Sequence, residues 1–436
     1  MSLSNYRDRS RMVVALLLGA MAAAACAGRG TDADDEPLAR SDADGGDGSR
    51  TPPPDGADGS FDDGGVPVDA EADGADGRVP CSADGWCITP LPSSTTPTSL
   101  RSVWADDTGV AWAVSDEGNV FRWDGQSWTL ARAGNDALYA IWGSGPTDLW
   151  ITSATGILHG TGPSSSSLTW TLIPLSELPG DVDTVLEAVG GTSANDVWFA
   201  GSRQIASGSA RYGVARVVRH RGLGGGGAPS FELESDLSTA ELPPVGPNSF
   251  KWDKVLGTPT GELVIAGAEA RSSGPYAQSV LRRVVEPSGE TTWVEMFASF
   301  GASASCADYV VTTKRGVTLG MARANRVWLM SNFNGRSTGL AVGTFDSDSR
   351  ATTWECSRMG TDQYLERSGL FATSATELWS VAAWGRINHY DGTNWRVSAV
   401  TATNLPITSD LYAISGAAGT IWAVGRDIAL RNVRPL

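Results

Sequence analysis

The residues best suited to catalysis or metal binding are few and widely spaced in this chain. Its three histidines, His159, His220 and His389, fall at equivalent or nearly equivalent positions in different copies of an internal repeat. Equivalent positions in separate repeats are spread around a structure, so this spacing disfavours a metal centre or a catalytic histidine. The Gly-x-Ser-x-Gly, Walker-type and His-Glu-x-x-His motifs are absent as well. We therefore expect no cofactor, no metal site and no catalytic residue.

Neighbouring carboxylates are the second candidate for acid–base chemistry. Asp181 and Asp183 fall in a turn, and Glu232 and Glu234 alternate along a strand pattern. Both arrangements are typical of a solvated surface rather than of a catalytic pair. The Asp-Gly-rich stretches before residue 80 do not complete a calcium loop, since the closing glutamate of such a loop is missing.

Cys26 has a setting that indicates covalent modification. Basic residues precede an apolar run over residues 12–25, which has the length of a secretory signal and is too short to span a bilayer. The run ends in AAAC at Cys26, which resembles the lipobox of bacterial lipoproteins and implies a diacylated Cys26 after cleavage. Ala27 then implies anchoring in the outer membrane. Ordinary cleavage at an A-x-A site, which would give a periplasmic or secreted protein, is the alternative.

The other four cysteines suit an oxidising compartment, because they form an even set. Cys81 and Cys87 lie close together in CSADGWC and are expected to pair. Cys306 and Cys356 would then form a second disulfide by elimination. The alternative is that one or both pairs remain buried thiols, and the C-x5-C spacing is a poor one for zinc.

Composition divides the 436-residue chain near residue 80, since all 17 Trp lie after that point. Residues 27–80 carry 13 Asp and 2 Glu against 4 Arg and contain little that could be buried. We predict a signal peptide over residues 1–25, a disordered acidic linker over 26–80 and one folded domain over 81–436. The net charge of −16 also disfavours a nucleic-acid partner.

An internal repeat organises the folded part. Seven units each begin with a segment such as LYAIWGS at Leu138, with ADYVVTT at Ala307 taken as the first segment of the fifth unit. A second segment follows that carries a Trp in six of the units, as in TDLWITS at Trp150. A short alternating segment and a fourth segment around another aromatic residue complete the unit. Four strands in each of seven units predict an all-β, seven-bladed β-propeller.

The fourth segment is missing from the last unit but present near the N-terminus. Asp84-Gly85-Trp86 has the same form as the DGQSW and DGTNW segments of other units. We therefore expect the strand near Trp86 to complete the last blade and to close the ring, which removes an exposed sheet edge. The repeated Trp are interpreted as core between the blades rather than as ligand-stacking residues.

The repeat is similar to those of bacterial exported propeller lipoproteins, loosely related to BNR/sialidase-type, Kelch-like and photosystem-assembly-factor-like propellers. The pattern L-x-x-V/I-W-G-S…D-V/L-W-A-V-G…G-x-I-x-H-Y-D-G-x-x-W carries this resemblance over residues 86–436. It implies a scaffold and no particular activity. The Asp-box of sialidase-like propellers is not completed, because Ser349 and Ala351 stand where its Asp and Gly should be.

Long loops in the middle of the chain are the strongest candidates for binding. Tight turns join the second and third strands of blades 1, 2, 6 and 7, whereas blades 3, 4 and 5 have long connections there. Up-and-down strand order puts these loops on the same face as the connections between blades. We hypothesise that they form a patch for an anionic or glycan-like partner, with insertions drifted on a non-functional surface as the alternative. The patch residues are Arg203, Arg211, Tyr212, Arg271, Tyr276, Asn332, Phe333 and Arg336.

Three functions remain open for this sequence. The leading one is a monomeric, non-enzymatic module, tethered to the cell-envelope membrane by its lipid, that binds envelope protein or polysaccharide. The second is a divergent sialidase- or lyase-like enzyme, which convergence of a carboxylate with Tyr and Arg in the central funnel would favour. The third is an assembly factor with an exposed apolar face. First-strand runs such as AIWGS, AVGGT and AISGA predict a funnel lined mostly by small, uncharged residues.

Overall fold

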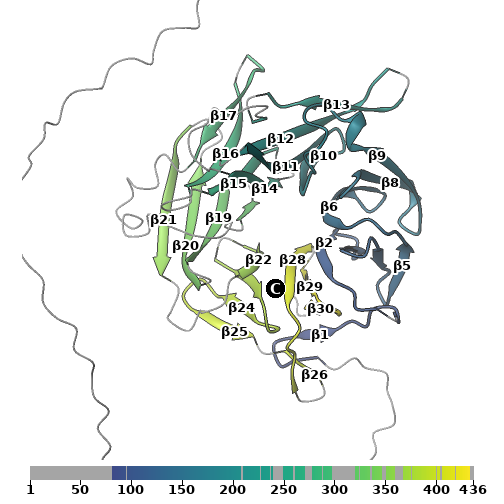
Figure 1. Cartoon of the computed structure of the whole chain (residues 1–436). Helices are drawn as coiled ribbons and strands as arrows, with labels where there is room; N and C mark the ends of the chain where they lie inside the picture. The colour runs from purple at the N-terminus through teal and green to yellow at the C-terminus, as the bar shows by residue number, and fades with distance from the viewer. Residues whose placement is uncertain are drawn as a thin grey trace, which may run out of the picture. The chain divides into compact units, whose positions relative to one another are not determined.

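The computed structural model describes residues 81–432 with gaps. The gaps are residues 95, 208–209, 226, 236, 239–248, 259–260, 271–276, 287, 297–319, 324, 334–335, 346–349, 359–366, 375, 399, 403–404 and 418. Within these limits the chain folds into seven four-stranded antiparallel sheets, which confirms the seven-bladed β-propeller (Figure 1). The signal-peptide and linker predictions, with Cys26, lie outside the described residues.

Each of the first six blades uses four strands that follow one another along the chain. Blade 1 comprises β2 (Leu100–Ala105), β3 (Ala111–Ser115), β4 (Val120–Trp123) and β5 (Trp128–Arg132); blade 2 comprises β6 (Leu138–Gly145), β7 (Asp148–Ser153), β8 (Gly156–Ser164) and β9 (Ser167–Pro174). Blade 3 comprises β10 (Ala188–Ser193), β11 (Asp196–Ser207), β12 (Ala210–Leu223) and β13 (Pro229–Leu233); blade 4 comprises β14 (Ser249–Gly257), β15 (Leu263–Ala270), β16 (Ala277–Val285) and β17 (Thr291–Glu295). Blade 5 comprises β18 (Gly320–Arg323), β19 (Arg326–Phe333), β20 (Arg336–Phe345) and β21 (Thr352–Arg358); blade 6 comprises β22 (Arg367–Ala372), β23 (Leu378–Ala382), β24 (Ile387–Tyr390) and β25 (Trp395–Ser398).

The seventh blade joins the two ends of the folded chain. It contains β28 (Leu411–Ala417), β29 (Thr420–Gly425) and β30 (Ile428–Asn432), and its outer strand is β1 (Trp86–Ile88). β1 runs antiparallel to β30, with Trp86 opposite Asn432 and Ile88 opposite Leu430. The predicted closing strand is therefore confirmed, and it covers an edge that would otherwise expose unpaired backbone groups.

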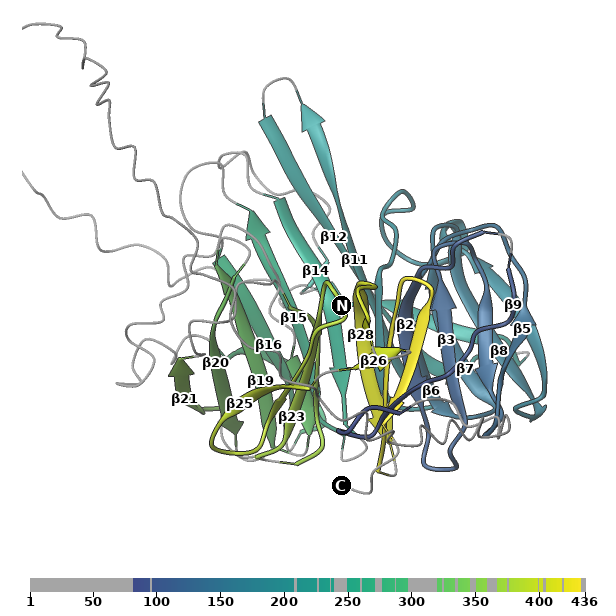
Figure 2. The same ribbon diagram turned by 90° about the horizontal axis from the view of Figure 1, so that it is seen from below.

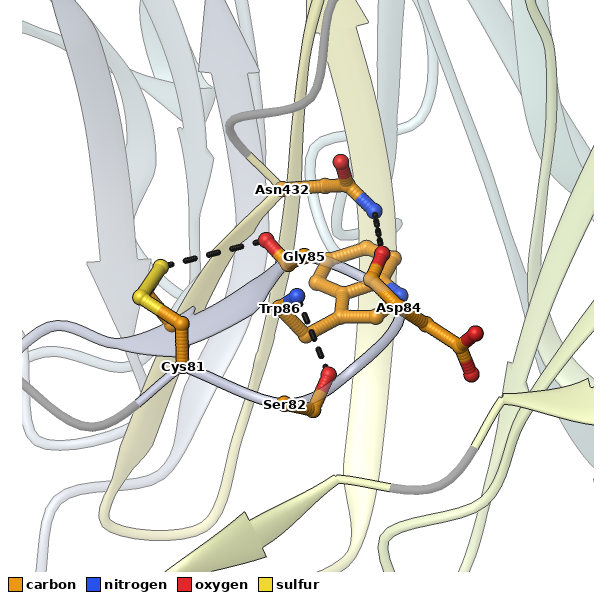
Figure 3. The surroundings of a disulfide bond; sticks show 7 residues. Cys81, Ser82, Asp84, Gly85, Trp86 and Asn432 are labelled. Carbon is orange, nitrogen blue, oxygen red and sulfur yellow. Dashed lines mark hydrogen bonds between the residues drawn. A yellow bond between two sulfur atoms is a disulfide. The ribbon is translucent and has the colours of Figure 1, made fainter.

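A disulfide holds the closing strand in shape. Cys81 and Cys87 are bonded to each other, as the sequence predicts, and enclose the turn that leads into Trp86 (Figure 3). Within this loop the Trp86 N–H donates to Ser82 Oγ over 3.1 Å, and Asn432 Nδ2 donates to the carbonyl oxygen of Asp84 over 3.2 Å (Figure 3). Cys356 is also disulfide-bonded, but Cys306 lies outside the described residues, so the second pairing stays a prediction.

The seven innermost strands form a closed ring. Each packs against its two neighbours in the order β2, β6, β10, β14, β18, β22, β28 and back to β2 (Figure 1). Among the described residues, seven hydrophobic clusters lie between adjacent blades. The repeated Trp are their largest members, and Trp112, Trp150, Trp198 and Trp422 are at most 1% exposed. Burying one such indole contributes roughly 5 kcal/mol of gross hydrophobic free energy, so the Trp belong to the core, as predicted.

One strand assignment from the sequence is wrong. β18 (Gly320–Arg323) pairs with β19 as the first strand of blade 5, so this position does not belong to ADYVVTT near Ala307, which lies outside the described residues. β18 ends three residues before β19 begins, so a tight turn joins the two. The long spacing between ADYVVTT and Trp328 was the signal that could have corrected this assignment. In the structure, Met321 stands opposite Trp328 much as Trp142 stands opposite Trp150 in blade 2.

Candidate binding site at the channel mouth

The inner strands enclose a cavity of about 230 Å³ on the axis of the ring. Its lining comes from the inner strands of blades 1, 2, 3, 4, 6 and 7, or from the residue just before them. Small residues such as Ala140, Ala188 and Ala413 contribute, as the sequence analysis expected. Most of the lining residues are uncharged, as the sequence analysis also expected, but three charged side chains and two phenols share the cavity with them. The charged residues and phenols are Arg101, Glu187, Lys254, Tyr139 and Tyr412, and Ser102, Ser368 and Ser415 add hydroxyl groups.

A repeated backbone irregularity brings these polar residues into the channel. Near its start, each of the ladders of β2, β6, β22 and β28 skips one residue, which is Arg101, Tyr139, Ser368 and Tyr412 respectively. A bulge of this kind places two residues of one strand opposite one of its partner and redirects the extra side chain. All four skipped residues line the cavity. The sequence analysis missed them because regular alternation along a strand does not predict the bulge.

Blades 3 and 4 contribute charge at the same level. Glu187 directly precedes β10, and its N–H donates to the carbonyl oxygen of Ala200 over 2.8 Å, so it adjoins the ladder as the skipped residues do. In β14 the register shifts between Trp252 and Lys254, and Lys254 lines the cavity. The cavity therefore combines one carboxylate, two cations and two phenols from different blades.

Arg101 is held in a fixed orientation at this site. Its Nε donates to the Asp116 carboxylate over 2.7 Å, and its guanidinium carbon lies 4.9 Å from the ring centroid of Tyr412. The hydrogen bond to Asp116 raises the pKa of Arg101, so the side chain stays charged. A contact of this kind between a guanidinium and a phenol ring is favourable and directional. Arg101 thus links blade 1 to blade 7 at the channel.

The hairpins between second and third strands and the connections between blades lie on the same face, as the sequence predicts. Hydrogen bonds join such hairpins to the residues that lead into an inner strand. Glu117, in the β3–β4 turn, accepts a hydrogen bond of 3.1 Å from the N–H of Ser99, which precedes β2. Asp410, which precedes β28, accepts one of 3.0 Å from the N–H of Trp384 in the β23–β24 turn. The bulge residues lie near the starts of their strands, so the channel opens on this face. We call it the channel-mouth face. Figure 2 shows β11 and β12 extending beyond their neighbours on one side.

The predicted basic and aromatic patch is brought together only in part. Arg211 and Tyr212 lie on β12 opposite Ala206 and Ile205, and Arg203 lies on β11. At the end of the β19–β20 hairpin, Phe333 stands opposite Arg336 with Asn332 beside it. These hairpins belong to blades 3 and 5. Arg271 and Tyr276 lie outside the described residues.

Arg203 already has acidic partners within the protein. Its Nε donates to Asp181 Oδ2 over 2.6 Å and its Nη2 donates to Asp181 Oδ1 over 2.8 Å, while Asp183 lies 3.4 Å away. The guanidinium holds the pKa of Asp181 below its usual range. Because this ion pair offsets the charge, Arg203 is a weaker candidate for binding an anion than the sequence suggests. Binding by the whole patch stays a prediction.

The histidines have structural roles. They belong to separate blades, but the rings of His159 and His220 both lie against the indole of Trp150, so the expected separation is wrong for this pair. His159 Nε2 lies 2.7 Å from Asp148 Oδ1, and its ring stacks on Trp150 with centroids 3.6 Å apart. His389 repeats the arrangement with Glu377, at 3.1 Å, and stacks on Trp379. Hydrogen bonds from His159 and Ser144 outweigh burial and hold the pKa of Asp148 below its usual range.

The third histidine lies one position further along its strand. Arg219 stands directly opposite Trp198, where the other two blades have histidine, and His220 instead places its Nδ1 3.1 Å from the carbonyl oxygen of Ser230. Burial lowers the pKa of His220 and of His389. Within the part of the chain that the structure describes, no three His, Cys, Asp or Glu side chains gather in a group that could hold a metal ion.

The described residues also contain no helix that is long and apolar enough to cross a membrane. No protein-family model and no curated protein matches the chain.

Solved structures resemble the chain in fold. Virginiamycin B lyase from Staphylococcus aureus is 12% identical, with a TM-score of 0.51 over 80% of this chain and 100% of the lyase. YCF48 from Cyanidioschyzon merolae is 16% identical, with a TM-score of 0.52 over 80% of this chain and 98% of its own. YCF48 bound to a D1 peptide is 16% identical, with a TM-score of 0.50 over 82% of this chain and 100% of its own. At such identities the likeness concerns architecture alone, and the chain is a β-propeller module.

Proposed function

We propose that the protein is a non-enzymatic binding module of the cell envelope, tethered through Cys26, and that its protein or polysaccharide ligand binds at the channel mouth. The observation that carries this proposal is the set of inner-strand bulges. They place Arg101, Tyr139 and Tyr412 from three blades in one cavity. Repeated bulges that redirect polar side chains toward one point are features that folds place beside functional sites.

Two further observations support the proposal. The longest described hairpin, formed by β11 with 12 residues and β12 with 14, extends from the channel-mouth face. Loops and hairpins on one face of a rigid scaffold are where binding usually occurs. The Cys81–Cys87 disulfide agrees with an exported protein, because such bonds persist in oxidising compartments.

The experiment compares variants of the cavity with variants of the outer rim. The double variant Tyr139→Ala/Tyr412→Ala removes both phenols from the cavity, whereas Leu130→Ala/Val397→Ala changes exposed side chains on the outer strands β5 and β25. Co-sedimentation with the envelope fraction of the source cells measures binding. We expect the cavity variant to lose at least about tenfold in affinity, from about 1.4 kcal/mol of lost contact, and the rim variant to lose none. Equal binding by both variants would disprove the proposal.

A glycan-cleaving enzyme is the second candidate, because Glu187, Tyr139 and Arg101 line the same cavity. Such an enzyme would use Glu187 in acid–base chemistry and Tyr139, from the neighbouring blade, as a nucleophile. Glu187→Gln distinguishes the two functions, since it keeps the size of the side chain and removes its acidity. Release of reducing ends from envelope polysaccharide that is abolished by Glu187→Gln would establish the enzyme. Binding without release supports the module.

A further inference from the structure

Trp384 differs from the other tryptophans of the chain. The Trp of the repeat are buried or partly buried, whereas Trp384 is 67% exposed in the turn between β23 and β24. Its indole makes no hydrogen bond or ring contact with any described residue, and only its backbone N–H is engaged, with Asp410. The side chain therefore contributes little to the core.

The backbone at Trp384 is strained in a way that its side chain does not explain. Trp384 has φ of 60°, in the left-handed region that bulky residues rarely adopt. The comparable turn of blade 7 has Asp427, with φ of 56°, and its carboxylate accepts a hydrogen bond from the N–H of Thr98. The Asp427 side chain thus joins neighbouring segments, whereas at Trp384 only the backbone N–H does so, through Asp410. The bulky side chain gains no hydrogen bond from the strained conformation, and backbone strain clusters at functional positions.

The backbone of the Trp384 turn packs against the connection that leads into β28. Gly385 donates its N–H to the carbonyl oxygen of Ser409 over 2.8 Å and lies directly against Ile407. Asp410, which binds the Trp384 backbone, is two residues before Tyr412 in the cavity lining. An exposed indole therefore stands on the channel-mouth face, in a turn that contacts the entry to β28, the strand that carries Tyr412.

We propose that the ligand of the channel-mouth face is a saccharide and that Trp384 is the platform on which one sugar ring stacks. A sugar ring has an apolar C–H face, which suits the indole, and hydroxyl groups, which suit the phenols, the carboxylate and the cations of the cavity. At about 230 Å³ the cavity is smaller than the roughly 300–1,000 Å³ of sites for drug-sized molecules, so it takes one sugar unit. Protein partners are usually anchored by apolar or aromatic side chains in dry pockets, and this polar lining does not offer such a pocket. The inference rests on the proposed function and specifies its ligand.

The test uses the full-length protein and Trp384→Asn. Asn tolerates the left-handed conformation better than Trp, so this variant should fold with an unchanged or higher Tm. Leu405→Ala is the matched control, because Leu405 is an exposed apolar residue, 68% exposed, in the connection that follows the same blade. The probes are chitohexaose, muramidase-solubilised peptidoglycan and protease-treated envelope polysaccharide, with calorimetry as the measurement. We expect at least one probe to bind, Trp384→Asn to weaken it roughly tenfold, and Leu405→Ala to leave it unchanged.

Three outcomes overturn the inference. One is saccharide binding that Trp384→Asn leaves intact. Another is binding to an untreated envelope fraction but to none of the saccharide probes, which would show that the ligand is not a saccharide. The proposed function would still hold in that case if Tyr139→Ala/Tyr412→Ala abolishes the binding. The last is a lower Tm for Trp384→Asn with unchanged binding, which would give Trp384 a structural role. Absence of binding to every fraction, untreated envelope included, would remove the proposed function as well.

Discussion

At the scale of single residues, one arrangement recurs in several blades: an acidic side chain binds a basic one that lies against the indole of a Trp. The residue types in this arrangement differ between blades. In blades 2 and 6 an acidic residue two positions before the Trp binds a histidine that stacks on the indole. In blade 3 Asp196 takes the acidic position and Arg219 replaces the histidine, lying 4.9 Å from the ring centroid of Trp198. Arg283 of blade 4 joins this cluster through a contact of 2.8 Å to Asp196. These side chains therefore join strands and blades rather than perform chemistry.

Asp196→Ala should be strongly destabilising. The substitution leaves the Arg219 and Arg283 side chains, 19% and 6% exposed, without their shared carboxylate. Removing one partner of a buried ion pair costs about 3–5 kcal/mol in the free energy of unfolding. Glu232→Ala breaks the exposed pair of Arg221 and Glu232 in the same blade and should cost less than about 1 kcal/mol. Urea unfolding followed by Trp fluorescence measures both variants, and equal losses would contradict this role for Asp196.

Stability should also fall as the pH drops below the ordinary histidine pKa of 6.5. Burial lowers the pKa of His220 and His389 in the folded protein, so protons bind more tightly to the unfolded chain. The stability from these groups is present above pH 6.5 and declines as the pH falls toward their folded pKa. Tm measured from pH 7.5 to 5 should decrease, and His220→Phe, which keeps a ring beside Trp150, should flatten the profile. An identical slope for His220→Phe would exclude His220 as a contributor.

At the scale of strands, the sequence predicts the repeating elements well and the exceptions poorly. Trp and β-branched residues at fixed spacing identify the four strands of each unit, and Asp84-Gly85-Trp86 correctly predicts the closing strand. Gly125 and Gly392, with φ of 104° and 90°, form the Asp-Gly turns before Trp128 and Trp395. These turns justify the comparison of Asp84-Gly85-Trp86 with the fourth segments of the other units. The first strand of the fifth unit was assigned wrongly, because Gly320–Arg323 rather than ADYVVTT pairs with β19.

The candidate site was harder to predict than the fold. Tyr139 and Tyr412 stand in the segments LYAIWGS and LYAISGA, each directly before an alanine. Strict alternation along a strand would point a tyrosine and the alanine after it to opposite faces, so it does not predict that both line the channel. The bulges do so, and a bulge depends on pairing with the next strand. Trp384 had a usable signal, since it is a Trp in the turn AWGR, outside every strand of the repeat.

The disulfide beside the closing strand should contribute to the stability of the fold. Cys81 and Cys87 are six positions apart, and in the chain-entropy account a loop of this size contributes about 2 kcal/mol. Cys81→Ser/Cys87→Ser should therefore lower the free energy of unfolding by about 2 kcal/mol while β1 remains paired with β30. Ser82→Ala serves as a control inside the same turn, with a smaller loss of about 1 kcal/mol from one hydrogen bond. No change on removing both cysteines would show that the turn is stable without the bond.

At the scale of the whole molecule, the account places binding on one face of a rigid ring. Seven interblade clusters and a closing strand fix the inner strands, and the bulges of those strands direct polar side chains from several blades to one cavity. The outer strands β5, β9 and β25 carry exposed apolar side chains at the rim, including Leu130, Leu172 and Val397. The channel-mouth face and the rim are thus separate surfaces that one experiment can compare.

Hydrogen–deuterium exchange of the protein with and without its envelope fraction tests the central claim most directly. Binding at the channel mouth predicts slower exchange at the starts of β2, β6 and β28, around Arg101, Tyr139 and Tyr412, and in the turn at Trp384. Slower exchange confined to the outer strands β5, β9 and β25, with these positions unchanged, would contradict it.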